Sequence, residues 1–446
     1  MTLPDTPSEW IGRFDHVTRL PNRTQLLEKL SRTSAKEDLG DPKVVLVLVT
    51  LADAEHFNQL LRALGHDFSE DFIRAGARRI GSLLPDGVTL FNVSVLSFAF
   101  VLEGESKASQ TRLVEAIGPC FAEPIKLGGI PVRSRAGVGV VDLEYGVSDP
   151  AEVLRAALTA AQDSRHKQQP YATYDPETDS KHRRGFRILT DLPEALRADD
   201  QIELHYQPRI DLKTDRCVAV EALFRWTHPV LGPISPVELF PLVESTTLIR
   251  PLTEKVLDVA IQQLAVWSKT FEGLSMSVNV SPNNLSEPDF AQKLQRLLRE
   301  RGVNARHLEL EFTEGAVAAD DAATLRALTQ IRALGMTVAI DDFGSGYSNM
   351  AYLTQIPADI IKIDKQFVLH VEPSGQSGFL LRKIVELAGG LGFEVVGEGV
   401  ETGEAYAFLK AIGCAQAQGY HIARPMPAAR LTEWLTIHAE TAAAET

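Results

Sequence analysis

The chain has 446 residues, of which 44% are hydrophobic and 23% charged, and its formal net charge is −14. A chain of this length is expected to form two or three domains with large apolar cores. The excess of 59 acidic over 45 basic residues disfavours binding to DNA or RNA duplexes and to anionic membrane surfaces. A small anionic ligand held through metal ions remains compatible with this charge.

The three cysteines, Cys120, Cys217 and Cys414, lie far apart and form no Cys-x-x-Cys pair. This spacing disfavours a disulfide framework or a zinc site and fits a reducing cytoplasm. Residues 1–11 place acids and prolines ahead of any apolar run, so we expect no signal peptide. The strongest apolar run, residues 44–51, is far too short to span a membrane.

The first 170 residues alternate between helical and strand-like patterns. Residues 43–51 are almost continuously apolar, which is typical of a central strand, and residues 69–84 repeat apolar side chains with helical spacing. Further strands are predicted at 88–93, 98–102 and 132–141, and further helices at 24–39, 108–121 and 151–166. The pattern predicts an α+β sandwich. Residues 164–184 are polar and include Pro170 and Pro176, and residues 171–190 are the predicted linker.

Residues 191–438 contain eight strand-like segments, most of them separated by amphipathic helices. The segments lie at 204–212, 217–226, 275–281, 308–313, 337–342, 359–363, 394–397 and 418–423. Repeated strand–helix units over about 250 residues predict a TIM-like (β/α)8 barrel, with a doubly wound open sheet as the alternative. The overall class is therefore α/β, and residues 439–446 are expected to form a C-terminal tail.

Polar side chains lie near the carboxyl ends of these segments, at the edge where a barrel places its active site. They are Gln207, Glu221, Asn279, Glu311, Asp341, Asp342, Lys362, Glu398 and Gln418. Each residue taken alone fits a turn or a solvated strand end, but so many acids in one barrel mouth would repel one another without divalent cations. Ligands that offer only oxygen favour Mg²⁺ or Mn²⁺ over zinc.

The pair Asp341 and Asp342 ends a β-branched apolar strand and is followed by Gly344 and Gly346. Glycines allow a loop to bend freely and to approach a ligand closely. We therefore expect a metal-binding pair of acids next to an adaptable loop.

The second region resembles the EAL family of cyclic di-GMP phosphodiesterases over roughly residues 190–438. The motifs follow in the family's order: His205-Tyr-Gln-Pro208, Glu221-Ala-Leu-Phe-Arg225, Val278-Asn-Val-Ser281, Glu311-Phe-Thr-Glu314, Asp341-Asp-Phe-Gly-Ser-Gly-Tyr-Ser348, Ile361-Lys-Ile-Asp364, Gly397-Glu-Gly-Val-Glu-Thr402 and Gln418-Gly-Tyr420. The resemblance implies that a water molecule, assisted by two Mg²⁺ or Mn²⁺ ions, hydrolyses cyclic di-GMP to linear pGpG. It also implies a homodimer formed through the barrel.

The same resemblance implies a role for individual residues. The metal ligands would be Glu221, Asn279, Glu311, Asp341, Asp342 and Glu398. The catalytic residues would be Lys362, Glu401 and Glu221. Substrate contacts would come from Gln207, Leu223, Arg225, Asp364 and Gln418. Glu314 would position the glycine-rich loop. The main alternative for the whole chain is a non-catalytic receptor or interaction protein that binds cyclic di-GMP.

The first region resembles GGDEF (diguanylate cyclase) domains at Asp15-His-Val-Thr-Arg-Leu-Pro-Asn-Arg23 and at Gly65-His66. The family's signature hairpin turn falls on Ser94-Val-Leu-Ser-Phe98, where only the phenylalanine agrees. Its guanine-reading positions fall on Leu61 and Arg62. These losses predict a degenerate, non-catalytic domain with a regulatory or dimerisation role, and they disfavour an enzyme that also makes cyclic di-GMP.

Overall fold

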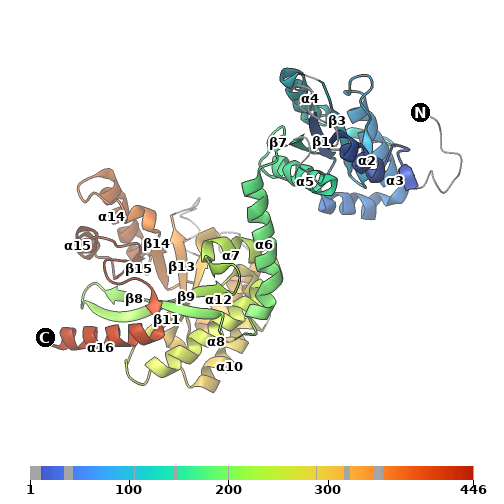
Figure 1. Ribbon diagram of the computed structural model, residues 1–446. Helices are drawn as coiled ribbons and strands as arrows, with labels where there is room; N and C mark the ends of the chain where they lie inside the picture. Colours follow the sequence, from blue (N-terminus) through green and yellow to red (C-terminus); the bar gives the residue numbers. More distant parts are fainter. Residues whose placement is uncertain are drawn as a thin grey trace. The chain divides into compact units, whose positions relative to one another are not determined.

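The computed structural model describes residues 12–34, 44–104, 106–143, 149–198, 200–287, 289–315, 322–344, 353 and 355–444. The chain divides into two compact units, Met1–Arg184 and Gly185–Thr446, which we call the first and the second unit. Figure 1 shows the helices and strands of both.

The first unit is built on a five-stranded sheet in the order β2-β3-β1-β6-β7. Its strands are Phe91–Ser94 (β2), Ser97–Leu102 (β3), Val44–Thr50 (β1), Gly137–Leu143 (β6) and Ala172–Thr173 (β7). The predicted central strand is confirmed, because β1 pairs antiparallel with both β3 and β6. A small separate hairpin joins Ile125–Leu127 (β4) and Ile130–Val132 (β5).

Helices cover both faces of this sheet. The helices are Arg23–Ser34 (α2), Ala54–Gly81 (α3), Lys107–Cys120 (α4) and Pro150–His166 (α5). Because successive side chains of a strand point to opposite faces, Val45 and Val47 of β1 belong to a core with residues of α3 and α4, whereas Leu46 and Leu48 belong to a core with residues of α2 and α5. The continuous apolar run of β1 therefore reflects burial on both faces.

Two details of the first unit differ from the prediction. The helix expected at 69–84 belongs to the longer α3, which is kinked at Gly65, where φ is 83°. The strand expected at 132–141 is interrupted, and only Gly137–Leu143 joins the main sheet. Gly139 of that strand lies against α5, where an added Cβ would come within 2.0 Å of the Ala157 carbonyl oxygen.

Helix α6, Pro176–Ala195, crosses the division between the two units. The residues predicted as a linker, 171–190, thus include strand β7 and most of α6. Within the first unit, Asp179 of α6 accepts two hydrogen bonds from Arg155 of α5, at 2.6 and 2.8 Å. These bonds attach the first turns of α6 to the first unit.

The second unit is a closed barrel of eight strands, which confirms the predicted fold. The strands are Ile202–Asp211 (β8), Arg216–His228 (β9), Ser275–Asn279 (β11), Leu308–Thr313 (β12), Thr337–Phe343 (β13), Ile360–Ile363 (β14), Glu394–Gly397 (β15) and Gln416–Gln418 (β16). Neighbours from β9 to β16 pair in parallel. Strand β8 closes the barrel and runs antiparallel to both β9 and β16, because only a short turn joins β8 to β9.

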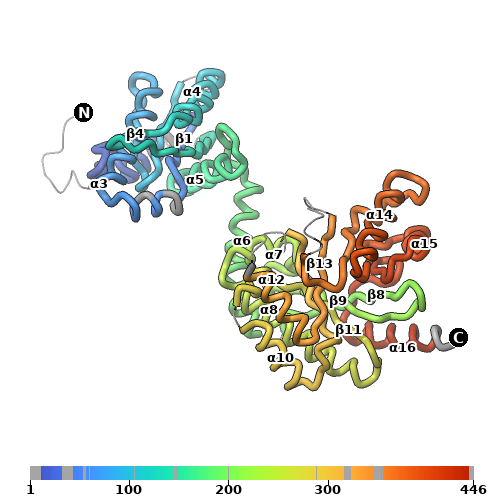
Figure 2. Tube along the Cα trace, turned by 180° about the vertical axis from the view of Figure 1, so that it is seen from behind, coloured from blue at the N-terminus to red at the C-terminus, as the bar shows by residue number. Residues whose placement is uncertain are grey.

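Helices of the second unit lie around the outside of the barrel strands (Figures 1 and 2). They are Pro236–Val243 (α7), Ile249–Trp267 (α8), Pro282–Leu285 (α9), Phe290–Arg301 (α10), Ala322–Ala333 (α12), Gln376–Gly390 (α14), Gly403–Ala411 (α15) and Ala428–Ala444 (α16), with short strands Gly232–Ile234 (β10) and Met426–Pro427 (β17) at the sheet edges. The face of α8 that carries Leu257, Ile261 and Leu264 is buried against the barrel.

The last barrel strand was predicted wrongly at 418–423, because β16 already ends at Gln418. The chain turns at Gly419, where an added Cβ would lie 2.2 Å from the Val400 backbone nitrogen. That nitrogen donates a hydrogen bond to the Gln418 carbonyl oxygen at 3.0 Å. Among the helices that the structure describes, none is both long and apolar enough to cross a membrane.

Candidate active site

The carboxyl ends of the barrel strands bring the predicted polar residues to one place. The register sets Gln207 opposite Glu221, Asn279 opposite Glu311 and Thr313 opposite Asp341. Within β12, Glu309 and Glu311 share one face because side chains alternate along a strand. Glu311 has no exposed surface and Glu221 is only 7% exposed, so the acids lie inside the barrel mouth.

Two amides donate to Glu221, and a third amide contacts one of these donors. Asn279 Nδ2 donates to Glu221 Oε1 at 2.9 Å, and Gln418 Nε2 donates to Glu221 Oε2 at 2.6 Å. The same Gln418 nitrogen also lies 3.2 Å from Gln207 Oε1, and Gln207 donates to the Ala423 carbonyl oxygen at 2.9 Å. Four strands therefore fix one carboxylate in one orientation.

Lys362 lies at the centre of the cluster, with a fully buried side chain. Its Nζ is 2.7 Å from Glu398, 2.8 Å from Glu311, 3.4 Å from Asp341 and 3.7 Å from Glu221. At these distances the pairs are ionic contacts, yet neither Lys362 Nζ nor either oxygen of Glu311 has a partner placed for a hydrogen bond. Buried polar atoms without partners are rare and call for an explanation.

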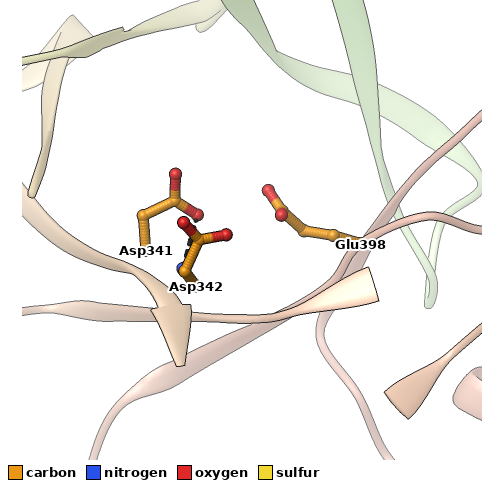
Figure 3. A group of neighbouring side chains, drawn as sticks. All are labelled: Asp341, Asp342 and Glu398. Atoms are coloured by element: carbon orange, nitrogen blue, oxygen red, sulfur yellow. Dashed lines mark hydrogen bonds between the residues drawn. The ribbon is translucent and has the colours of Figure 1, made fainter. Parts of the chain in front are cut away.

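A break in the β13–β14 register explains how two consecutive acids reach one mouth. Neighbouring residues of a regular strand point to opposite faces, but the pairing shifts between Ile340 and Phe343 and Asp342 has a φ of 54°. Oxygens of Asp341, Asp342 and Glu398 consequently lie within 4.8 Å of one another, and Figure 3 shows the three carboxylates converging. This oxygen-only set, together with the unpartnered Glu311 oxygens, fits divalent ions such as Mg²⁺.

The electrostatics of the cluster reflect burial and mutual repulsion. Burial, with the charge of Asp341, raises the pKa of Glu398 to about 8 and that of Asp342 to about 6. Burial and Glu221 also raise the pKa of Glu311. For Glu221, burial is outweighed by Lys362 and the two amide donors, so its pKa is lowered. Burial would lower the pKa of Lys362, but the surrounding carboxylates raise it, so this side chain stays charged.

Glu314 lies where β12 leads into the next segment, and its Oε2 accepts a hydrogen bond from the Gly344 backbone nitrogen at 2.9 Å. Gly344 has a φ of 92°, and an added Cβ would lie 2.7 Å from the Phe367 ring. Glu314 thus contacts the first residue of the glycine-rich loop. Gly346 and its neighbours at 345–352 lie outside the described residues.

Three other predicted residues lie around the cluster. Arg225 is partly buried and donates to the Phe224 carbonyl oxygen at 2.7 Å. Asp364 follows β14, caps a short helix by accepting from Gln366 N at 2.7 Å, and helps to raise the pKa of Asp342. Glu401 is exposed, and no hydrogen bond or ion pair joins it to the cluster in the described part of the chain.

Two features of the barrel escaped the sequence prediction. The first is a cavity of about 300 Å³ beside the acids, lined by residues that include Leu223, Arg225, Phe240, Leu252, Asn279 and Glu311. The second is a buried bidentate ion pair beneath the acids, in which Arg209 donates to Glu309 at 2.7 and 2.5 Å. Arg209 follows the predicted site residue Gln207 by two positions, and Glu309 precedes Glu311 by two. Because residues two apart on a strand face the same side of the sheet, the sequence could have predicted that both point into the barrel.

Comparison with known proteins assigns both units. The family model of the EAL domain matches residues 189–425, and the family model described as "Diguanylate cyclase, GGDEF domain" matches residues 13–170. The chain therefore belongs to the EAL family and carries a GGDEF domain in tandem with its EAL domain.

Among similar proteins, "Cyclic di-GMP phosphodiesterase PA2567" of Pseudomonas aeruginosa PAO1 is 36% identical over 95% of this chain and 71% of its own length. "Bifunctional diguanylate cyclase/cyclic di-GMP phosphodiesterase MucR" of the same strain is 30% identical over 94% of this chain and 61% of its own length. "Cyclic di-GMP phosphodiesterase PdeR" of Escherichia coli K12 is 30% identical over 95% and 63%. The chain thus spans less than two thirds of the latter two.

Solved structures also resemble part of the chain. The "PaMucR Phosphodiesterase, c-di-GMP complex" is 36% identical with a TM-score of 0.52, covering 55% of this chain and 99% of that one. The "EAL Enzyme Bd1971 - cAMP and cyclic-di-GMP bound form" is 25% identical with a TM-score of 0.54, covering 68% and 82%.

Proposed function

We propose that the protein hydrolyses cyclic di-GMP to linear pGpG in the barrel mouth of its second unit. The observation that carries this proposal is the convergence of Glu221, Glu311, Asp341, Asp342 and Glu398 around a buried lysine. Support also comes from the relatives named as cyclic di-GMP phosphodiesterases. A dinucleotide with two phosphodiesters suits this site, because its acids would bind metal ions and the Lys362 ammonium would bind a phosphate.

Two Mg²⁺ or Mn²⁺ ions would be held by six side chains. Glu221, Asn279, Glu311 and Asp341 would hold one ion, and Asp341, Asp342 and Glu398 would hold the other. When bound, such ions lower the pKa of water and neutralise charge on the phosphate. The amides of Asn279 and Gln418 keep Glu221 oriented for its role.

The chain's own groups would bind and orient the substrate. Lys362 stays protonated and would stabilise negative charge on the phosphoryl oxygens. The planar guanidinium of Arg225 suits a phosphate or a base edge, and Leu223 lies beside it in the cavity wall. Gln207, Gln418 and Asp364 would make polar contacts. Glu401, which is exposed, would accept a proton through a water molecule rather than by direct contact.

The apolar cavity beside the acids would take one planar base. Its wall contains Phe240 and Leu252, while Asn279 and Glu311 connect it to the acid cluster. Such a surface favours stacking and burial of an apolar ring, with a few polar groups to set its orientation.

The test is direct. Full-length protein with Mg²⁺ or Mn²⁺ and cyclic di-GMP should release pGpG, detected by chromatography, and chelation of the metal should stop the reaction. Protein that binds cyclic di-GMP but never cleaves it with either metal would be a receptor, and the enzyme proposal would fail.

The first unit is proposed to be a degenerate GGDEF domain that regulates the barrel. The turn between β2 and β3 carries the exposed Val95, followed by Leu96, between Ser94 and a buried Ser97, where acids and glycines would be expected. Incubation with GTP should yield no cyclic di-GMP. Comparing residues 185–446 with the full chain for activity would show whether the first unit activates or inhibits.

A homodimer through the barrel is also proposed. Helix α14 and the residue after it expose Phe379, Leu380, Leu387 and Leu391, and apolar side chains gathered on one helix mark contact surfaces. Light scattering should give twice the chain mass, and Phe379→Asp should reduce it to the monomer. The unpaired cysteines fit the cytoplasm as the proposed location.

A further inference from the structure

Lys362 contacts the same acids that are proposed to hold metal. Its ammonium lies within 3.7 Å of Glu221, Glu311, Asp341 and Glu398. These four residues are divided between the two proposed ion sites, and Asp341 belongs to both. Asp341 and Glu398 converge with Asp342 in Figure 3. The lysine therefore touches the metal ligands themselves rather than the rim of the site.

The charge balance makes this position unusual. Four carboxylates surround a single ammonium, and buried charges without a partner are strongly destabilising. Arg209, a further buried cation among the described barrel residues, is engaged by both oxygens of Glu309. Lys362 is thus a buried cation in ionic contact with four of the acids that are proposed to bind metal.

The contacts are Coulombic rather than directional. Lys362 Nζ has no partner in hydrogen-bonding geometry, and the Glu311 oxygens are equally unpartnered. A charge held by attraction without fixed hydrogen bonds can exchange partners at lower cost than one held in a bidentate fork, such as Arg209 with Glu309.

We propose that Lys362 is the counter-ion of the acid cluster when no metal is bound, and that it competes with divalent cations for these carboxylates. The second half of this proposal rests on the proposed metal site. Carboxylates that hold ions would no longer need the ammonium as a counter-ion, and Lys362 would then be free to meet the phosphate. The lysine thereby keeps the metal-free barrel folded and weakens metal affinity, so that metal uptake and lysine release are linked.

The test compares Lys362→Met with the charge-preserving Lys362→Arg in the full chain. Lys269→Met is the matched control, because Lys269 is an exposed lysine in the loop before β11. Thermal midpoints are measured in EDTA and in excess Mn²⁺, and Mn²⁺ affinity is measured by calorimetry. Lys362→Met should lower the thermal midpoint in EDTA by several degrees. Mn²⁺ should then raise this midpoint by more than it raises that of the unchanged protein. The variant should also bind Mn²⁺ at least about tenfold more tightly than the unchanged protein.

A second variant separates charge from packing. Lys362→Met combined with Asp341→Asn removes one charge of each sign, because the Asp341 carboxylate lies 3.4 Å from the ammonium. The midpoint in EDTA should therefore return toward that of the unchanged protein. If the loss came from packing alone, the double variant would be no more stable than Lys362→Met. Lys362→Arg should stay close to the unchanged protein in EDTA, whether or not Lys362→Met folds.

The outcomes are decisive. An unchanged midpoint in EDTA for Lys362→Met overturns the counter-ion role, and an unchanged or weaker Mn²⁺ affinity overturns the competition. If the unchanged protein binds neither Mn²⁺ nor Mg²⁺, the proposed function and the competition fail together. The EDTA midpoints still decide the counter-ion role in that case.

Discussion

The two units bury very different polar groups. Among the described residues, the buried polar side chains of the first unit are nearly all neutral, with Asp179 as the charged exception. The barrel of the second unit buries several charges, including Arg209, Glu309, Glu311 and Lys362. Both units have large apolar cores. Buried charges are costly and cluster at functional sites, so the contrast supports the proposed active site in the second unit.

The strand ends repeat this contrast. In the first unit the β2–β3 turn carries small and apolar residues and leaves Val95 largely exposed. In the second unit the strand ends carry acids that are held by amides and a lysine. The core of a fold does not depend on which residues stand at its strand ends, because packing and chemistry use different positions.

The largest expected effect is on turnover. Glu221→Gln keeps the size of the side chain but removes the charge, so hydrolysis of cyclic di-GMP should fall by about 10³-fold or more. The matched change in the first unit, Ser97→Ala, should leave the rate of hydrolysis within about twofold. The buried Ser97 hydroxyl has one side-chain hydrogen bond in the described part of the chain, with the Thr50 hydroxyl. A rate measured by product chromatography that drops equally in both variants would remove the contrast between the units.

The next effect is on stability. Arg209→Met leaves Glu309 as a buried charge without its partner, which should destabilise the second unit by about 3–5 kcal/mol in urea unfolding. Adding Glu309→Leu should recover most of this loss, because two apolar residues can replace a buried ion pair. A double variant as unstable as Arg209→Met would show that the pair has a further role.

A moderate effect is expected at the loop contact. Glu314→Ala removes the hydrogen bond to the Gly344 backbone nitrogen without removing any proposed ligand. We expect metal or substrate affinity to fall by about 10–100-fold, the usual range for groups that orient ligands. Kinetics and affinities equal to those of the unchanged protein would show that the hydrogen bond between Glu314 and Gly344 does not influence metal or substrate binding.

The smallest effect is a pH dependence in the first unit. Hydrogen bonds from Arg155 and Tyr174 lower the pKa of Asp179 from 3.8 to about 2. Because the folded pKa lies below the unfolded one, this contribution is complete above about pH 4 and is lost as the pH falls through about 2. Hydrogen exchange of α5 should rise in that window, and Asp179→Asn should abolish the pH dependence while raising exchange at neutral pH.

The sequence alone determined the barrel and most of its site. Strand alternation and the convergence of parallel strand ends were enough to gather Glu221, Glu311, Asp341 and Lys362, because both rules are local or topological. The antiparallel direction of β8, the shared mouth of Asp341 and Asp342, and the extent of α6 were decided by the tertiary structure.

Tertiary structure also determined which side chains contact each other. Arg209 and Glu309 are 100 positions apart, and Gln418 and Glu221 are 197 apart. The alternation of residues along each strand predicts which side chains face the barrel interior. Closure of the barrel determines which of these side chains contact one another. The charge surrounding Lys362 is therefore a property of the closed barrel, because five strands must meet before one ammonium can face four carboxylates.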